Sequence, residues 1–412
     1  MKFNKWTLGL AAVGLVSWNS AAVAEDAAAP ATVLTSLSST TLSGYVDTSA
    51  QWNLGTGNAN TPPYSFGGAS KADGFNLNVV QLSLDKPLDE SQWAAGYHVD
   101  LWLGPDANAL GTSSINSSGA SDFAIRQAYV SLRTPVGNGL DWKIGVFDTV
   151  IGYESLSSPN NPNITHSYGF TMEPTTHTGI LGTYKINDMV NVSAGIANTM
   201  GPAINEKAHG PNNSSARLAE SSKTYMASAS FSAPTSWGWA GGSTLSVGLV
   251  NGFSDFAGEG NGGNQINVYA GLTMNTPVSA LKVGSSLDFS QVHDSNRVSG
   301  GDVPDGSIWD AALYATFQAT EKLSLSVRGE FLDDSADTVI DAGDLGHNRA
   351  KVWSGTATAQ YDLWKNVISR VEFRWDHGDN AKFFGANSNS SSGSGPTRKN
   401  AYLLAAQVIY KF

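Results

Sequence analysis

Hydrophobic and polar residues alternate with a period of two from about residue 40 to the end of the chain. In the clearest stretch, Trp93, Tyr97 and Val99 fall on one face. His98 and Asp100 fall on the opposite face. This period is typical of a β-strand with one apolar and one polar side, whereas an amphipathic helix repeats every 3.6 residues. The pattern therefore predicts an all-β chain.

About sixteen segments of this kind follow one another along the sequence. They begin near Leu42, Phe75, Trp93, Ile125, Leu140, Gly179, Val190, Tyr225, Leu245, Ile266, Leu281, Trp309, Leu323, Trp353, Val367 and Tyr402. Several run for about nine to twelve residues, which exceeds the usual soluble strand and matches a tilted strand that crosses a bilayer. The lengths favour strands that span a membrane.

The connections between these segments alternate between short and long. The short ones are 86–91, 134–139, 186–188, 233–242, 275–280, 320–321 and 362–366. The long ones are 54–73, 104–121, 148–176, 198–222, 251–264, 291–306, 333–348 and 377–397. Short periplasmic turns and long extracellular loops are the layout of a transmembrane, antiparallel, up-and-down β-barrel. An even strand count places both termini on the side of the short turns.

Two places break the alternation. Val79 and Val80 belong to apolar runs of opposite parity, which predicts either a β-bulge near Val79 or a strand that is covered on both faces. Arg126 shares the parity of Ala128 and Val130, which would direct its charge at lipid. We therefore expect a second bulge at Arg126.

The first residues resemble an export signal. Lys2 and Lys5 precede an apolar stretch that is too short to span a bilayer, and a small-residue motif ends at Ala24. Residues 1–24 are therefore predicted to be a cleaved signal peptide and residues 25–39 a short periplasmic segment. Residues 40–412 would form the barrel.

The composition excludes several other classes of protein. The chain has no cysteine, its charged residues are 14%, and its net charge is −11. A disulfide scaffold and a cysteine-bound metal are excluded, and an acidic chain argues against a nucleic-acid partner. The seven histidines are scattered and no hydrolase motif is present, so neither an enzyme nor a cofactor is expected. His98 and Asp100 share a strand face, which we interpret as lumen polarity.

Three adjoining stretches carry a family resemblance. They are RQAYVSLRTPVGNGLDWKIGVFDTVIGYE at 126–154, SSPNNPNITHSYGF at 157–170 and EPTTHTGILGTYKIND at 173–188. They resemble the putative beta-barrel porin-2 family, also described as OmpL-like. The resemblance implies an outer-membrane porin in contact with lipid, and it names no solute. Porins are often trimers, so a homotrimer is one expected assembly, and the terminal Phe412 resembles the aromatic residue that the barrel-assembly machinery recognises.

A barrel of this size leaves an aqueous channel, so the polar parity becomes a list of pore-lining residues. The basic ones are Arg133, Lys143, Lys185, Lys282, Arg328, Arg370 and Arg374. The acidic ones are Asp47, Asp100, Asp141, Asp288, Asp310, Glu330 and Glu372. The balance predicts no strong charge preference in the wall. Five of these residues lie on two nearby strands and form a charged wall near the C-terminus, namely Arg328, Glu330, Arg370, Glu372 and Arg374. This wall has two open interpretations. It could create a transverse field that orients solutes, or its side chains could form internal ion pairs that fill the lumen.

Loop 148–176 is the longest connection. Its polar side chains are Glu154, Asn160, Asn161, Asn163, His166 and Glu173. We expect it to fold inward and narrow the channel, where amide and carboxylate groups would bind polar solutes by hydrogen bonds. The alternative is an external surface loop.

Two further loops are rich in acidic residues. These residues are Asp333, Asp334, Asp337, Asp341 and Asp344 in one loop and Asp376, His377 and Asp379 in the other. We expect a solvated acidic rim that favours cations, in preference to a divalent-cation site.

Passive diffusion of small polar solutes or ions through a water-filled barrel is thus the function we expect. Two rivals remain open. One is an outer-membrane enzyme of the lipase or protease type, and the other is a closed structural or adhesive barrel.

Overall fold

The computed structural model describes residues 39–55, 57–112, 121–207, 222–253, 264–293, 295–297, 301–303, 306–336, 339–340, 349–385 and 395–412. The predicted signal peptide, residues 1–24, lies outside these residues. So does all but the last residue of the predicted periplasmic segment, 25–39.

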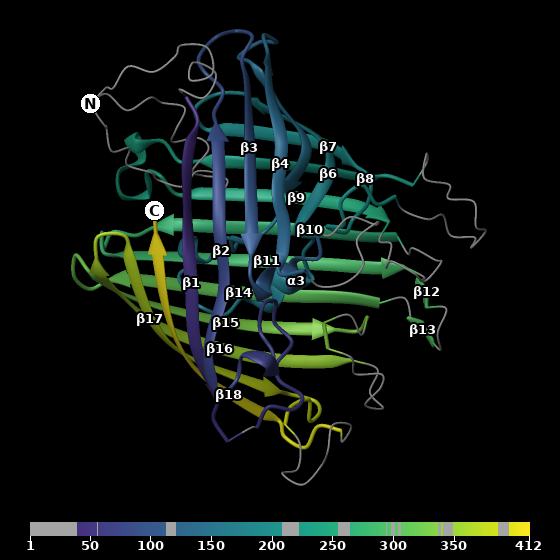
Figure 1. Ribbon diagram of the computed structural model, residues 1–412, viewed down its shortest axis with the longest axis vertical. Coiled ribbons are helices and arrows are strands. Elements are labelled where there is room, and N and C mark those ends of the chain that lie inside the picture. Colours follow the sequence, from purple (N-terminus) through teal and green to yellow (C-terminus); the bar gives the residue numbers. More distant parts are fainter. Residues whose placement is uncertain are drawn as a thin grey trace.

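Sixteen strands of the described residues close into one barrel (Figure 1). They are β1 (Thr41–Asn53), β2 (Gly74–Lys86), β3 (Ala95–Leu103), β4 (Phe123–Thr134), β5 (Leu140–Asp148), β6 (Thr176–Lys185), β7 (Val190–Ala197), β8 (Thr224–Ser232), β9 (Thr244–Phe253), β10 (Asn264–Asn275), β11 (Leu281–His293), β14 (Gly306–Gln318), β15 (Leu323–Asp334), β16 (Ala350–Trp364), β17 (Val367–Gly378) and β18 (Asn400–Lys411). Every strand pairs antiparallel with its neighbours in sequence, and β1 pairs with β18. The predicted all-β, up-and-down barrel and its strand number are confirmed.

Shorter elements lie between the strands. They are β12 (Ser295–Arg297) and β13 (Gly301–Val303), the helices α3 (Pro105–Leu110) and α4 (Tyr168–Met172), and the 3₁₀ turns η1 (Ala69–Lys71), η2 (Ser158–Asn160) and η3 (Thr235–Ala240). Strands β12 and β13 pair only with each other. Within the described ranges, no helix combines the length and the apolar character needed to cross a membrane.

Both predicted bulges are present. On β2, Val79 lies opposite Asp47 while Leu77 lies opposite Thr48, so Asn78 is the extra residue. The bulge turns the Asn78 amide into the barrel, where it donates a hydrogen bond to Asp47 at 3.0 Å.

The second bulge redirects Arg126. Gln127 lies opposite Asp100 and Ile125 lies opposite Leu101, which leaves Arg126 unpaired in the ladder of β3 and β4. Its side chain is buried inside the barrel, because the bulge reverses the parity that would have aimed it at lipid.

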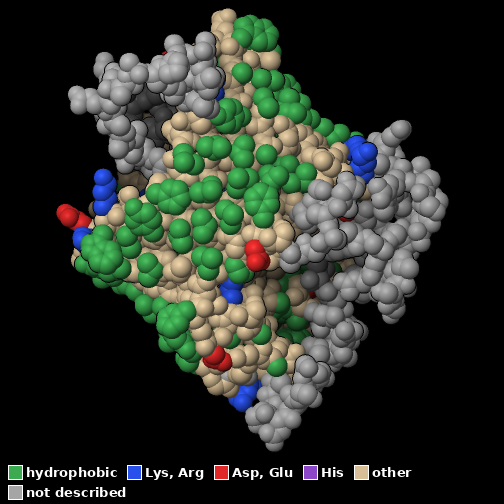
Figure 2. Space-filling model, viewed as in Figure 1, with side chains coloured by type: hydrophobic (Ala, Val, Ile, Leu, Met, Phe, Trp, Pro, Cys, Tyr) green, Lys and Arg blue, Asp and Glu red, His purple; other side chains and the backbone are tan. Residues whose placement is uncertain are grey.

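The two faces of the wall differ in chemistry, as the alternation predicts. On β14 the outward Leu313 is 69% exposed, whereas the inward Asp310 is 1% exposed. Figure 2 shows apolar side chains spread over one face of the barrel, with few Lys, Arg, Asp or Glu side chains among them. An apolar exterior around a polar interior is the arrangement that a hydrocarbon solvent requires.

The barrel closes at the end with the short turns. Gly44 and Phe412 exchange two backbone hydrogen bonds of 3.0 Å, so the last residue continues the ladder between β1 and β18. The C-terminus lies with the short turns, and the long connections leave the opposite end (Figure 1).

Candidate functional site

The connection from β5 to β6, residues 149–175, lies inside the barrel and contains η2 and α4. Its apolar side chains join three separate clusters on the inner wall. Ile151 packs with residues of β5–β10, Leu156 and Phe170 pack with residues of β1–β4, β17 and β18, and Tyr168 and Met172 pack mainly with residues of β11 and β14–β16. All sixteen strands contribute to one of these clusters. The loop therefore lies across the lumen and is joined to the wall through these three clusters.

Arginine side chains of the wall hold the backbone of this loop. Arg328 on β15 donates to the carbonyl oxygens of Thr165 at 2.7 Å and His166 at 3.1 Å. Arg374 on β17 donates to the His166 carbonyl at 2.6 Å and to the carboxylate of Asp376. Both guanidinium groups are buried, so they face the loop and not open water.

A wall carboxylate makes the complementary contact. Glu372 on β17 accepts from the Thr165 amide at 2.9 Å, from the Thr165 hydroxyl at 2.7 Å and from the Thr358 hydroxyl at 2.7 Å. It also accepts from the amide of Ile164. Four donors around one buried carboxylate fix the position of the loop at this point.

The short helix α4 is tied to the same wall. Ser167 caps it by accepting from the Phe170 amide. The Tyr168 amide donates to Glu330 at 2.8 Å, and the Tyr168 hydroxyl donates to Asp376 at 2.9 Å. The predicted charged wall near the C-terminus is therefore engaged with the loop, which agrees with the interpretation of internal pairing.

Glu154 is the ionised anchor within the loop. Its carboxylate accepts from Arg328 at 2.9 Å, from the Ser167 amide at 3.1 Å and from the Tyr314 hydroxyl at 3.1 Å, and it pairs with the His166 ring at 2.9 Å. Burial alone would raise the pKa of Glu154, but the charge of Arg328 and the bond to His166 hold that pKa at about 2.

Glu173, at the other end of the loop, lies in the opposite environment. Its carboxyl group lies beside that of Asp288 on β11, and Asp310 on β14 lies close by. Burial, and then the neighbouring charge of Asp288, raise the pKa of Glu173 well above its ordinary value.

The asparagines of the loop differ in exposure. Asn163 is buried and donates to the Thr358 hydroxyl at 2.7 Å. Asn161 bridges the backbone of Ser155 within the loop. Asn160 is exposed.

A second polar network joins the loop to the N-terminal strands and to β17. Arg126 donates to Asp100 at 3.0 Å, to the Ser157 hydroxyl at 2.9 Å and to Asp148. Arg370 donates to the Ser158 carbonyl at 3.0 Å.

Gln407 extends this network to β1. Its amide donates to both oxygens of Asp47 at 3.0 Å and to the Ser158 hydroxyl at 3.0 Å. The contact joins β18, β1 and the loop at one place.

The remaining predicted pore-lining residues lie away from the loop, toward the short turns. Arg133 and Asp141 form an ion pair with 2.6 Å between nitrogen and oxygen. The Lys143 ammonium group lies 4.7 Å from the centre of the Tyr129 ring. Lys185 pairs with a turn carboxylate, and Lys282 is exposed.

His98 and Asp100 do not form a catalytic triad. The His98 ring bridges two carboxylates, Asp85 at 2.9 Å and Asp100 at 3.1 Å. The nearby Ser83 hydroxyl donates to Asp100 at 2.5 Å and not to the ring. In a catalytic triad the histidine lies between the nucleophile and the acid and is hydrogen-bonded to both.

The expected solvated acidic rim is wrong for two of its members. Asp334 is fully buried and accepts the amides of Ala336, Val339 and Ile340. Asp376 lies on β17 and is paired with Arg374, because the strands extend further than the alternation alone indicates.

The other residues of the predicted rim lie near the surface or outside the described ranges. Asp333 pairs with the partly exposed Arg349. Asp337, Asp341 and Asp344 lie outside the described residues. No group of three or more metal-ligating side chains within the described ranges could hold an ion.

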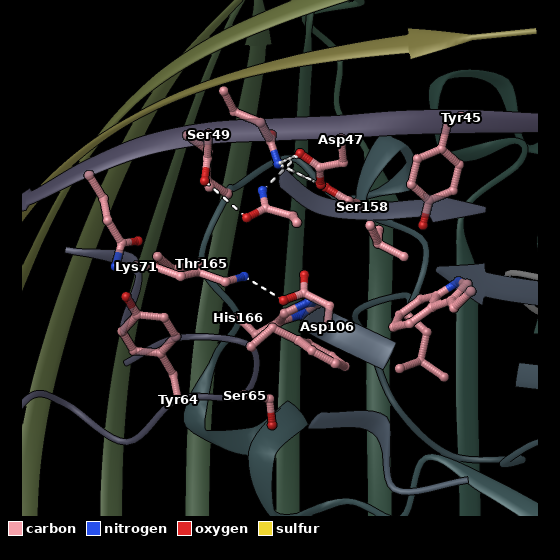
Figure 3. A pocket seen from close by; sticks show the side chains of 18 residues that line it. Tyr45, Asp47, Ser49, Tyr64, Ser65, Lys71, Asp106, Ser158, Thr165 and His166 are labelled. Carbon is pink, nitrogen blue, oxygen red and sulfur yellow. Dashed lines mark hydrogen bonds and ion pairs between the residues drawn. The ribbon is translucent and has the colours of Figure 1, made fainter. Parts of the chain in front are cut away.

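A small cavity separates the loop from β1 (Figure 3). It has a volume of about 40 Å³, enough for a few waters. Asp47, Tyr64 and His166 line it together with the ion pair of Lys71 and Asp106, whose charged atoms are 2.5 Å apart.

Several residues of these networks were not among the predicted site residues, and Arg126, Asp148, Tyr168 and Gln407 are examples. The sequence signal for Arg126 was a charge on an apolar face. Gln407 lies on the inward face of β18, so the alternation could have indicated it. Asp148 ends β5 and Tyr168 lies in the loop, where the alternation assigns no face.

Comparisons with known proteins agree with this architecture. The anion-selective porin from Comamonas acidovorans is 14% identical, and the match covers 91% of this chain and 99% of that one with a TM-score of 0.56. The outer membrane channel DcaP of Acinetobacter baumannii is 12% identical, with 90% and 97% covered and a TM-score of 0.59. The trimer form of OmpT of Vibrio cholerae is 12% identical, with 90% and 99% covered and a TM-score of 0.53. At these identities the likeness shows the fold alone.

Sequence comparison gives the family. None of the curated proteins matches the chain. The family model described as putative beta-barrel porin-2, OmpL-like, matches residues 39–412. Since that match spans the whole barrel, the chain belongs to the putative beta-barrel porin-2, OmpL-like family, and it is a porin-type barrel of the outer membrane.

Proposed function

We propose that the protein is a porin through which small polar solutes or ions diffuse passively across the outer membrane. The observation that carries the proposal is a polar interior crossed by loop 149–175 inside an apolar wall. Such a loop is the narrowest element on the path and would set the size and charge of what passes. No cofactor or energy source is needed, because the solute follows its own gradient.

The burial of the charged residues separates those that hold the loop from those that can contact a solute. Arg328, Glu330, Arg370, Glu372 and Arg374 are covered and hold the loop, so they position the constriction and do not touch the solute. The groups left to meet a solute are those with water access.

On the loop the exposed polar group is Asn160. Toward the short turns, the charged groups with water access include the cations Arg133, Lys143 and Lys282 and the carboxylates of Asp85, Asp141 and Asp362. Since both signs are present in similar number, we expect no strong charge preference on the periplasmic side of the constriction.

A closed structural or adhesive barrel is the second candidate, and one observation favours it. Apolar side chains of the loop belong to clusters that together include residues of every strand, so side chains fill much of the lumen at its level. An outer-membrane enzyme has weaker support, because the His98 network has the wrong order for nucleophilic catalysis.

Three further parts of the proposal concern export and assembly. Residues 1–24 would direct export and be removed after Ala24, which N-terminal sequencing of the mature protein tests. The exposed ring of Phe412 would be read by the barrel-assembly machinery. A homotrimer is the assembly we propose, supported by the trimer form of OmpT, and native mass spectrometry in detergent tests it.

Single-channel recording of the purified protein in a planar bilayer tests the central proposal. We expect stepwise openings and, in a salt gradient, a reversal potential close to zero. Lys143→Glu should move that potential toward cations. Protein that is folded by circular dichroism and silent at every pH would refute the porin and leave the closed barrel.

A further inference from the structure

The junction between the loop and the wall at β11 and β14 contains three carboxyl groups. Glu173 belongs to the loop, Asp288 to β11 and Asp310 to β14, and the two wall residues are 3% and 1% exposed. The carboxyl groups of Glu173 and Asp288 lie close enough to influence each other. An ionised carboxylate has no hydrogen to donate, so a hydrogen bond between these two groups requires a proton on one of them.

Asp310 adds a second sign that this cluster takes up protons. Neither of its side-chain oxygens has a hydrogen-bond partner within the described part of the chain, although both are buried. A methyl group placed on Gly169 of α4 would lie 2.7 Å from an Asp288 oxygen and 3.0 Å from an Asp310 oxygen. The two wall carboxyls therefore point at the same spot on the loop backbone.

The surroundings do not neutralise this cluster. The titratable and charged groups that face it are Tyr153 and Glu154 of the loop, Tyr269 of β10, Tyr314 of β14, and Arg328 and Glu330 of β15. Arg328 is the cation among them, and its N–H groups are already bonded to Glu154 and to the carbonyls of Thr165 and His166.

Asp288 and Asp310 are buried and Glu173 is half-buried. Three carboxylates confined to one such site cannot all ionise without strong repulsion. Desolvation, and then this repulsion, raise the pKa of Glu173. A carboxyl whose pKa is higher in the docked loop stabilises docking at low pH, and that stabilisation is lost as the pH rises through the raised value.

We propose that Glu173, Asp288 and Asp310 form a proton-dependent latch on loop 149–175. With protons shared among the three carboxyls, the segment from Gly169 to Glu173 stays against β11 and β14 and the lumen is closed. When the protons leave, repulsion separates Glu173 from the wall and the channel opens. This latch rests on the proposed porin function.

The open fraction of single channels of the full-length protein, recorded between about pH 4 and pH 9, tests the latch. The wild-type open fraction is expected to rise about 10-fold or more over this range. The double variant Glu173→Gln with Asp310→Asn carries neutral amides that imitate the protonated state, so it should stay mostly closed at every pH. Asp310→Asn alone should reduce the response. Asp106→Asn, in an ion pair outside the cluster, should retain it.

A second measurement follows the loop without relying on conductance. The chain has no cysteine, so Thr171→Cys provides one site for a spin label within the segment from Gly169 to Glu173, at a half-buried position. We expect the label to become more mobile at high pH. In a chain that also carries Glu173→Gln and Asp310→Asn, the label should remain immobile.

The outcomes separate the latch from the channel. Openings that do not depend on pH, or a double variant that responds like the wild type, would overturn the latch and leave the porin. The protein could also show no conductance while the spin label on its loop becomes mobile at high pH. If that release is lost in the double variant, the result would support the latch and refute the porin.

Discussion

Glu372 offers the sharpest test of how the loop is held. The change Glu372→Gln keeps the size of the side chain and replaces one acceptor oxygen by an NH₂ group. Each oxygen of Glu372 now accepts from one backbone amide, of Ile164 or Thr165, and from one hydroxyl. In either orientation of the glutamine side chain, its NH₂ group faces the backbone N–H of Ile164 or of Thr165, so two donors meet.

The expected cost follows from these contacts. A hydrogen bond to a charged group contributes about 1.5–3 kcal/mol, and a neutral one contributes about 1 kcal/mol. Loss of one amide contact and weakening of the others should reduce the docking free energy of the loop by about 3 kcal/mol. That corresponds to roughly a 100-fold larger population of the released loop.

Amide hydrogen exchange of the full-length protein in detergent measures this change. The amides of Ile164 and Thr165 should exchange about 100-fold faster in Glu372→Gln, while those of the barrel ladder stay protected. Asp362→Asn is the matched control, since it makes the same chemical change at the short-turn end of neighbouring β16, away from the loop. Exchange within about threefold of the wild type at both amides would show that the carboxylate does not hold the loop.

Three other changes test the remaining contacts. Arg126→Met removes the arginine partner of the buried Asp100 and the half-buried Asp148, and it should lower the free energy of unfolding in urea titrations by about 3 kcal/mol. Glu154→Gln should mobilise a loop spin label equally at every pH above about 4.5, because the lowered pKa keeps this anchor charged there and its contribution fades only as the pH falls toward 2. Phe412→Ala keeps the backbone bonds of the last residue, so refolding in detergent should persist while the amount assembled in cells drops severalfold. Equal amounts in cells would remove Phe412 as an assembly signal.

Much of the barrel could be predicted from alternation because a strand between lipid and water needs one apolar and one polar face. Even the irregularities were visible, since Arg126 on an apolar face has no stable place unless a bulge turns it inward. Asp334 and Asp376 show the limit of this reasoning. A carboxylate at a strand end is compatible with both a solvated loop and a buried ion pair, and only the length of the strand decides between them.

The role of the charged wall could not be read from the pattern either. Parity states that Arg328 and Glu372 point inward, but it does not state whether water or protein lies there. The informative residues were the apolar ones in the loop itself. Ile151, Leu156 and Phe170 would be costly in water, and their place in the wall clusters explains why the loop crosses the lumen.

The two acidic contacts of the loop respond to pH in opposite ways, and this determines how the loop can move. Glu154 is paired with Arg328, so its contact with β15 persists as the pH rises. Glu173 depends on a shared proton, so its contact with β11 weakens over the same change. Buried ion pairs contribute little net stability but fix geometry, so the Glu154 end acts as a fixed point while the Glu173 end is released. A loop held at both ends by ion pairs would stay closed at neutral pH, and one held only by shared protons would lose its position when it opened. The combination permits a channel that opens by rotation of one segment and closes again in the same register.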